Sequence, residues 1–187
     1  MEEQLREQLL EDEQLLWVGA PESFETLDRT NKTSIIVGTI IKGGVTLFLV
    51  YAFSFAQGNG SNNIGLIVVV LMFAAFALLN PFLVARRLRK KTIYGLTDKR
   101  ILRAGTFNEA VPYDRIKTAV LRTDADGHTS LLCGSRAVNL KPRQLRAEAD
   151  ASFINSNDEP EAARVILFAL PMDSKLKALL ERYLPLK

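Results

Sequence analysis

Two long apolar stretches, residues 34–56 and 64–85, limit what this chain can fold into. An α-helix over either stretch is about 33–35 Å long, which is enough to cross the ~30 Å hydrocarbon core of a bilayer. A soluble chain of 187 residues is too short to bury two such helices in its core. The two stretches therefore predict a transmembrane α-helical hairpin over residues 34–85.

Positive charges lie at only one end of this hairpin. Arg29 and Lys32 precede the first stretch, and five Lys or Arg residues follow the second within residues 86–91. The connecting turn, Gln57–Asn63, carries no charge. Because positively charged loops stay in the cytoplasm, both ends of the chain are predicted to be cytoplasmic. The first residues lack the cationic and apolar regions of a signal peptide, so none is expected.

The hairpin separates two polar parts of opposite charge. Residues 1–33 hold nine acidic and three basic residues, a net charge of −6, and residues 86–187 hold twenty basic and twelve acidic residues, a net charge of +8. A basic domain is attracted to an anionic leaflet, and the acidic segment can weaken that attraction by folding onto the domain. Ordinary solvated surfaces also explain these charges, and the sequence leaves both interpretations open.

The N-terminal segment contains a short amphipathic pattern over residues 2–16. Its leucines share one face of a helix and its acidic residues the other, which predicts a helix that packs on the soluble domain or on a second copy. Gly19 and Pro21 are expected to end this helix. Trp17, just before them, is expected to be a packing residue rather than a ligand-binding one.

Two polar residues interrupt the apolar stretches. Lys42 lies about eight residues inside the first, and a charge at that depth is a functional hypothesis by default. The alternative is that its long side chain snorkels towards the cytoplasmic headgroups. Asn80 lies at a comparable depth in the second stretch, so a contact between the two is a hypothesis. Pro81 removes a backbone hydrogen bond and is expected to kink the helix.

The part after residue 91 is mostly strand-like. Residues 124–127 (Asp-Ala-Asp-Gly) predict a hairpin loop, and residues 141–161 predict a polar loop in which 142–148 can add a helical turn. An amphipathic helix is predicted from a cap at Asp173 or Ser174 to Leu184. Strands are predicted at Thr92–Thr97, Arg100–Ala104, Lys117–Thr123, His128–Cys133, Ala137–Leu140 and Arg164–Leu170.

Metal and cofactor chemistry is not expected. Cys133 is the single cysteine and His128 the single histidine, so no intramolecular disulfide can form and no Cys/His metal site is expected. We also find no phosphate-binding glycine loop, no nucleophile elbow and no sign of buried acid–base groups. The sequence therefore predicts a protein that is not an enzyme, with no catalytic residues and no cofactor.

Three segments resemble bacterial pleckstrin-homology-like (PH-like) domains attached to two membrane helices. Thr92–Leu102 (TIYGLTDKRIL) resembles the opening hairpin of these domains, and Val111–Ile116 (VPYDRI) resembles the start of the next strand. Glu11–Pro21 (EDEQLLWVGAP) resembles their Glu-x-x-Leu-Trp-x-Gly-x-Pro entry segment, with Ala20 where Arg is usual. The resemblance implies a membrane helical hairpin followed by a mainly-β split barrel of about seven strands, capped by the C-terminal helix.

This resemblance also bears on location and function. It implies a bacterial inner-membrane protein in which residues 1–33 and the domain of residues 86–187 are cytoplasmic, and a binding scaffold rather than an enzyme. Relatives that bind phosphoinositides use basic residues around the first hairpin. The matching candidates here for an anionic headgroup are Lys90, Lys91, Lys99, Arg100 and Arg103.

Three functions from different classes follow from these observations. The first is a membrane-anchored PH-like module that binds a protein partner or a second copy. The second is a module that senses anionic lipid through the basic residues just named. The third, which has the least support, is a channel or transporter component built around Lys42 and Asn80. The lipid bilayer is a partner in all three, and no nucleic-acid partner is expected.

Overall fold

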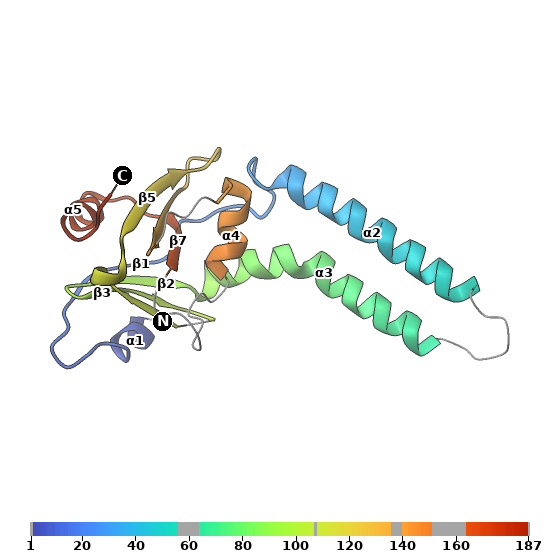
Figure 1. Cartoon of the computed structure of the whole chain (residues 1–187), viewed down its shortest axis with the longest axis horizontal. Helices are drawn as coiled ribbons and strands as arrows, with labels where there is room; N and C mark the ends of the chain where they lie inside the picture. Colours follow the sequence, from blue (N-terminus) through green and yellow to red (C-terminus); the bar gives the residue numbers. More distant parts are fainter. Residues whose placement is uncertain (1, 56–63, 107, 136–139, 151–163, 187) are drawn as a thin grey trace.

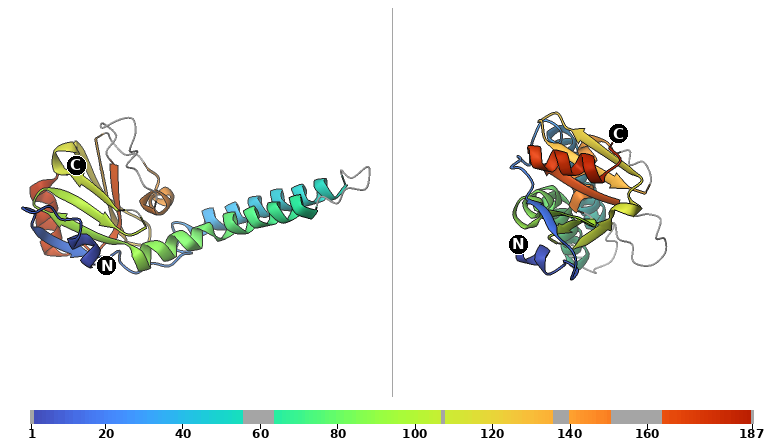
Figure 2. Two further views of the ribbon diagram at one scale, coloured as in Figure 1. Left: turned by 90° about the horizontal axis from the view of Figure 1, so that it is seen from below. Right: turned by 90° about the vertical axis from the view of Figure 1, so that its left-hand side faces the viewer.

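The computed structural model describes residues 2–55, 64–106, 108–135, 140–150 and 164–186. A small mainly-β domain lies at one end of the molecule, and two long helices project from it side by side (Figures 1 and 2). The elements, in chain order, are α1 (Glu2–Arg6), β1 (Leu15–Gly19), α2 (Lys32–Phe55), α3 (Ile64–Lys91), β2 (Ile93–Thr97), β3 (Arg100–Ala104), β4 (Glu109–Pro112), a 3₁₀ turn (Tyr113–Arg115), β5 (Thr118–Thr123), β6 (Thr129–Gly134), α4 (Pro142–Asp150), β7 (Arg164–Leu170) and α5 (Ser174–Tyr183).

The projecting helices α2 and α3 contain the two apolar stretches. Both are long and apolar enough to cross a membrane, at 24 and 28 residues. Almost none of their apolar surface is buried within the protein, and Ile40, Phe48 and Phe73 are each about 70% exposed. They are therefore not core helices of the domain. The expected turn, Gln57–Asn63, lies outside the described residues.

The described strands form two antiparallel sheets. One has the order β1-β2-β3-β4 and the other β5-β6-β7. Strands β3 and β7 have the predicted bounds, and the hairpin loop at 124–127 is confirmed, with Gly127 at a positive φ of 88°. Helix α5 is also confirmed, because Asp173 caps it by accepting a hydrogen bond from Leu176 N at 2.6 Å. Of the strand predicted at Ala137–Leu140, only Leu140 is described.

The prediction of a helix over residues 2–16 is correct only for Glu2–Arg6 and wrong for the rest of the segment. Helix α1 ends at Arg6, and Leu15–Gly19 forms β1, which pairs antiparallel with β2. Pairing with β2 satisfies the backbone groups of this segment and buries Trp17, and this gain outweighs the helical pattern of its leucines. Trp17 is a packing residue, as predicted, and is 6% exposed.

Helix α4 replaces part of the predicted polar loop. The structure forms two full helical turns over Pro142–Asp150, and residues 151–161 lie outside the described residues. Leu145 and Ala149 are buried on one face, so the apolar contact with the domain favours the helix despite its polar composition.

The buried residues form three clusters. The largest lies between the two sheets and includes Trp17, Tyr94 and two leucines of α5. A second joins the end of α3 to the domain, because Val84, Ala85 and Leu88 pack in it with residues of α4, β6 and β7. In the third, Leu5 of α1 packs on β2 and β3. The N-terminal segment and the last turns of α3 are thus parts of the domain.

Candidate functional site at the junction of hairpin and domain

A groove of about 620 Å³ lies where the segment leading into α2 crosses the β5–β6 loop. Asp126 and His128 form one wall of this junction groove, and the other wall comes from the segment before α2 and its first residue: Ser23, Phe24, Glu25, Leu27, Asp28, Arg29 and Lys32. The two loops lie close together beside the start of α2 (Figure 1). The volume is in the range of small-molecule binding sites, which makes the junction groove the candidate site.

Asp126 holds the two walls together. Its carboxylate accepts hydrogen bonds from the backbone N–H groups of Arg29 at 3.1 Å and Thr30 at 3.0 Å, and from Thr30 Oγ1 at 2.8 Å. Desolvation opposes ionisation, but these hydrogen bonds outweigh it and hold the pKa of Asp126 below its ordinary value. The sequence indicates only a turn at Asp126, because its contact with Arg29, 97 residues away, depends on the fold.

A buried ion pair lies beside the groove and includes its lining residue Asp28. Arg146 of α4 pairs with Asp28, and both are under 7% exposed. Arg146 also donates to the carbonyl oxygens of Thr26 at 2.9 Å and Glu25 at 3.2 Å. Desolvation lowers the pKa of Arg146, and the charge of Asp28 opposes that shift. Since a buried charge is costly without a partner, this pair fixes α4 against the segment that enters α2.

Phe24 lines the groove and is 4% exposed. Its ring packs edge-on against Phe168 of β7, with centroids 5.0 Å apart, and against His128 at 6.4 Å. The guanidinium of Arg146 lies 4.6 Å from the ring centroid and that of Arg89 lies 5.6 Å from it, which are cation–π distances. Phe24 therefore connects the groove to α3, through Arg89, and to α4, through Arg146.

Three carboxylates near the groove approach one another. Those of Asp28, Asp124 and Asp126 lie within 4.8 Å, a spacing that a metal ion could bridge. Asp28 is paired with Arg146, and the carboxylate of Asp124 accepts hydrogen bonds from the N–H groups of residues 126 and 128 within its own loop. Contacts that hold the fold explain this arrangement, and the ion pair of Asp28 with Arg146 disfavours a metal ion bound by all three carboxylates.

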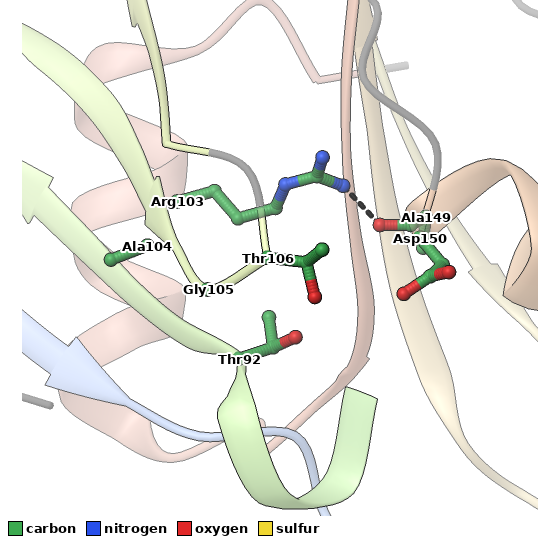
Figure 3. Close-up of a pocket in the computed structure, with 7 residues that line it drawn as sticks. All are labelled: Thr92, Arg103, Ala104, Gly105, Thr106, Ala149 and Asp150. Atoms are coloured by element: carbon green, nitrogen blue, oxygen red, sulfur yellow. Dashed lines mark hydrogen bonds between the residues drawn. The ribbon is translucent and has the colours of Figure 1, made fainter. Parts of the chain in front are cut away.

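Of the five headgroup candidates, the structure places two in ion pairs of the domain. Arg100 pairs with the buried Glu13 at 2.8 Å and donates to the carbonyl oxygen of Gln8 at 2.6 Å. Arg103 is 3% exposed, pairs with Glu109 at 3.0 Å and donates to the carbonyl oxygen of Ala149. Figure 3 shows Arg103 reaching across a small cleft to the end of α4.

The other three candidates are exposed lysines in two places. Lys90 and Lys91 are the last residues of α3, next to the domain, and Lys99 lies in the β2–β3 turn. The five candidates do not converge on one pocket among the described residues. The contacts of Arg100 also show how the acidic N-terminal segment folds onto the domain, which was one of the two interpretations of its charge.

Lys42 has a partner inside the hairpin, although not the one hypothesised. Its Nζ atom donates to the carbonyl oxygen of Ala77 at 3.0 Å, three residues before Asn80. Ala77 is the residue whose carbonyl would accept from the N–H of residue 81 in a regular helix, and Pro81 has no N–H. The lysine therefore supplies the donor that the proline removes.

The surroundings of Cys133 and His128 favour structural roles for both residues. Cys133 is buried on β6, and this burial raises the pKa of its thiol to about 12, so a reactive thiolate is disfavoured at neutral pH. His128 Nδ1 lies 3.6 Å from a carboxylate oxygen of Glu22 beside the groove.

Comparisons with known proteins add no family to this description. The chain matches no protein-family model, and no curated protein or solved structure is significantly similar to it.

Proposed function

We propose that this protein is a membrane-anchored, non-enzymatic interaction module. In this proposal α2 and α3 cross the bacterial inner membrane, and a PH-like domain on the cytoplasmic face binds a protein partner or a second copy. Two sheets of four and three strands with a C-terminal helix are compatible with the PH-like resemblance of residues 11–21 and 92–187.

The observation that carries this proposal is the continuity of α3. The helix runs from its apolar span directly into the domain, where Val84, Ala85 and Leu88 are buried. Arg87 at the same end pairs with Asp150 of α4 at 2.5 Å. A domain that shares its core with a membrane helix is held at a fixed height and orientation, which suits a surface that receives partners at the membrane.

The charges at the domain end of the hairpin support the orientation. Exposed Arg29 and Lys32 precede α2, and exposed Arg86, Lys90 and Lys91 lie in the last turns of α3. Basic residues beside the ends of two apolar spans favour retention of those ends in the cytoplasm.

Site-specific labelling in spheroplasts tests the membrane placement. We expect Lys177→Cys, in a Cys133→Ser background, to react with a membrane-impermeant maleimide only after the membrane is permeabilised. Labelling of intact spheroplasts would contradict the cytoplasmic domain, and extraction of the chain by alkaline carbonate would contradict the anchor.

Photo-crosslinking in cells tests the partner. A photoreactive residue at exposed positions of α5 and α4, Lys177 and Arg143, should give adducts of discrete mass. An adduct of twice the chain mass indicates a second copy, and any other discrete mass indicates a different protein. Failure of both positions and of Lys99 to form any adduct would contradict the interaction module.

Lys90 and Lys91 favour a second candidate function, the sensing of anionic lipid. Both are exposed at the end of α3, where headgroups lie if α3 crosses the membrane. If this function is correct, anionic lipid in nanodiscs stabilises the wild-type chain, and Lys90→Glu with Lys91→Glu abolishes that stabilisation. Lys175→Glu with Lys177→Glu on α5 is the matched control. An equal lipid response in both double variants would exclude this function.

A further inference from the structure

The junction groove lies at the depth of lipid headgroups if α2 crosses the membrane. Lys32 is the first residue of α2 and Ile35 begins its apolar part, so the two are about 4.5 Å apart along the helix axis. The headgroup layer on each side of a bilayer is about 5–8 Å thick. A headgroup in the same leaflet therefore lies level with the groove, whose lining includes Leu27, which is 42% exposed.

The groove carries balanced charges of both signs. Asp28 is neutralised by Arg146, which leaves the carboxylates of Glu25 and Asp126 and the cations Arg29 and Lys32 along its walls. Glu25, Arg29 and Lys32 are exposed. A simple anion in this groove meets two carboxylates, and a simple cation meets two basic groups. A ligand with both charges a short distance apart matches the lining.

The walls that present these charges are held in place. Asp126 fixes the backbone of residues 29 and 30, and Arg146 fixes the backbone of residues 25 and 26. Less conformational freedom is then lost when a ligand binds, which favours affinity.

We propose that the junction groove binds the headgroup of a phosphoethanolamine lipid. Arg29 and Lys32 donate hydrogen bonds to the phosphate, and the primary ammonium donates to Glu25 and Asp126. A choline headgroup has no N–H to donate, and a glycerol headgroup has no positive charge for the carboxylates. The proposal rests on the proposed function, since insertion of α2 brings the headgroup to the groove.

Native mass spectrometry of the delipidated full chain tests the selection. The detergent micelles contain equal amounts of phosphatidylethanolamine, phosphatidylcholine and phosphatidylglycerol. We expect the ethanolamine lipid to be retained about tenfold more than either competitor, the ratio expected for one additional charge-assisted hydrogen bond. Equal retention of the three lipids, or preference for the choline or glycerol lipid, overturns the proposal.

Variants then assign the two halves of the headgroup. Glu25→Gln should reduce the excess retention of the ethanolamine lipid over the choline lipid, and Arg29→Gln with Lys32→Gln should reduce the retention of all three. Glu181→Gln and Lys177→Gln on α5, away from the groove (Figure 1), are the matched controls. Unchanged selection in Glu25→Gln overturns the assignment. Selection by the wild-type chain tests the proposal even where a variant fails to fold.

Two further measurements separate the possible failures. Soluble O-phosphoethanolamine is added as a competitor, and if it displaces the lipid at similar concentration, the ligand is a soluble molecule and the lipid proposal is wrong. If maleimide labelling shows that α2 and α3 do not span the membrane, the proposed function fails as well. A spanning chain without ethanolamine selection contradicts this inference alone.

Discussion

Tyr94 satisfies backbone groups that a bulge in β7 leaves without partners in the sheet. The β6–β7 register shifts between Thr129 and Leu131, and Ala169 has a positive φ of 50°. The buried Tyr94 hydroxyl accepts from Phe168 N at 3.0 Å and donates to Phe168 O at 3.1 Å. Burial raises the pKa of Tyr94, so the hydroxyl keeps its proton and can donate.

We therefore expect Tyr94→Phe to lower the free energy of unfolding by about 1–3 kcal/mol, because it leaves two buried backbone groups unsatisfied. Chemical denaturation of the full chain in detergent, followed by tryptophan fluorescence, measures this loss. Tyr183→Phe, a partly exposed tyrosine on α5, is the control. Equal stability of the two variants would show that the Tyr94 hydroxyl does not support the bulge.

Glu13 makes the N-terminal segment sensitive to acid. Its buried carboxylate accepts hydrogen bonds from Arg100 Nε at 2.9 Å and Thr97 Oγ1 at 2.6 Å. Desolvation alone would raise the pKa of Glu13, but these hydrogen bonds and the Arg100 charge lower it below 4.5. A carboxyl whose pKa is lower in the folded state stabilises the fold above its unfolded pKa.

We expect this stabilisation to disappear as the pH falls from about 4.5 through the lowered pKa of the folded state. Protection of the amides of β2 and β3 from hydrogen exchange, measured between pH 6 and pH 3, reports the change. Glu13→Gln should be less stable at pH 6 and should flatten the profile, whereas Glu11→Gln, which is exposed, should not. A profile unaffected by Glu13→Gln would contradict this role.

At the scale of elements, the hairpin and α4 each depend on a contact between distant segments. Helix α4 contacts both ends of the hairpin, through Arg146 to Asp28 and through Asp150 to Arg87. Desolvation raises the pKa of Asp150 despite its ion pair with Arg87, which reflects how closely α4 is packed there. In the hairpin, Lys42 of α2 donates to the carbonyl oxygen of Ala77 in α3, which has no backbone donor because residue 81 is a proline.

A double-mutant cycle tests the pairing of Lys42 with Pro81. Lys42→Met should destabilise the hairpin by about 0.6–2 kcal/mol, because it leaves the Ala77 carbonyl without a donor. Pro81→Ala restores a backbone N–H four residues after Ala77, so Lys42→Met should cost less in that background. Unfolding of the full chain by SDS measures the four variants. Additive effects would show that the lysine does not replace the missing donor.

At the scale of the whole molecule, the domain consists of segments on both sides of the hairpin. Strand β1 and Phe24 come from before α2, and Val84, Ala85 and Leu88 come from α3. Trp17 connects β1 to α5, because its Nε1 donates to Asp173 Oδ2 at 3.3 Å. The unit that folds is therefore larger than the residues that follow the second apolar stretch.

We expect residues 92–187 alone to lack a cooperative unfolding transition, since they lose an edge strand and parts of all three buried clusters. A chain in which residues 2–31 are joined to 84–187 by a flexible linker should retain that transition. Thermal unfolding followed by near-ultraviolet circular dichroism compares the two. A cooperative transition of equal midpoint in the shorter chain would show that the N-terminal segment is dispensable.

The sequence by itself determined the elements whose cause is local. Long apolar runs specify α2 and α3, the Asp124–Gly127 loop specifies the β5–β6 hairpin, and a cap followed by amphipathic spacing specifies α5. These signals lie within about twenty neighbouring residues, so no knowledge of the fold is needed. The same local reasoning failed at residues 15–19, where pairing with β2 decides the structure.

Only the tertiary structure decided the candidate site. The junction groove depends on contacts such as Asp126 with Arg29 and Asp28 with Arg146, which join residues about 100 positions apart. Arg100 looked like a surface cation until its contact with Glu13, 87 residues away, placed it in the fold. In the sequence alone, each of these charged residues looks like part of the solvated surface. Whether such a charge can be buried depends on the partner that the fold places beside it, because an unpaired buried charge is costly.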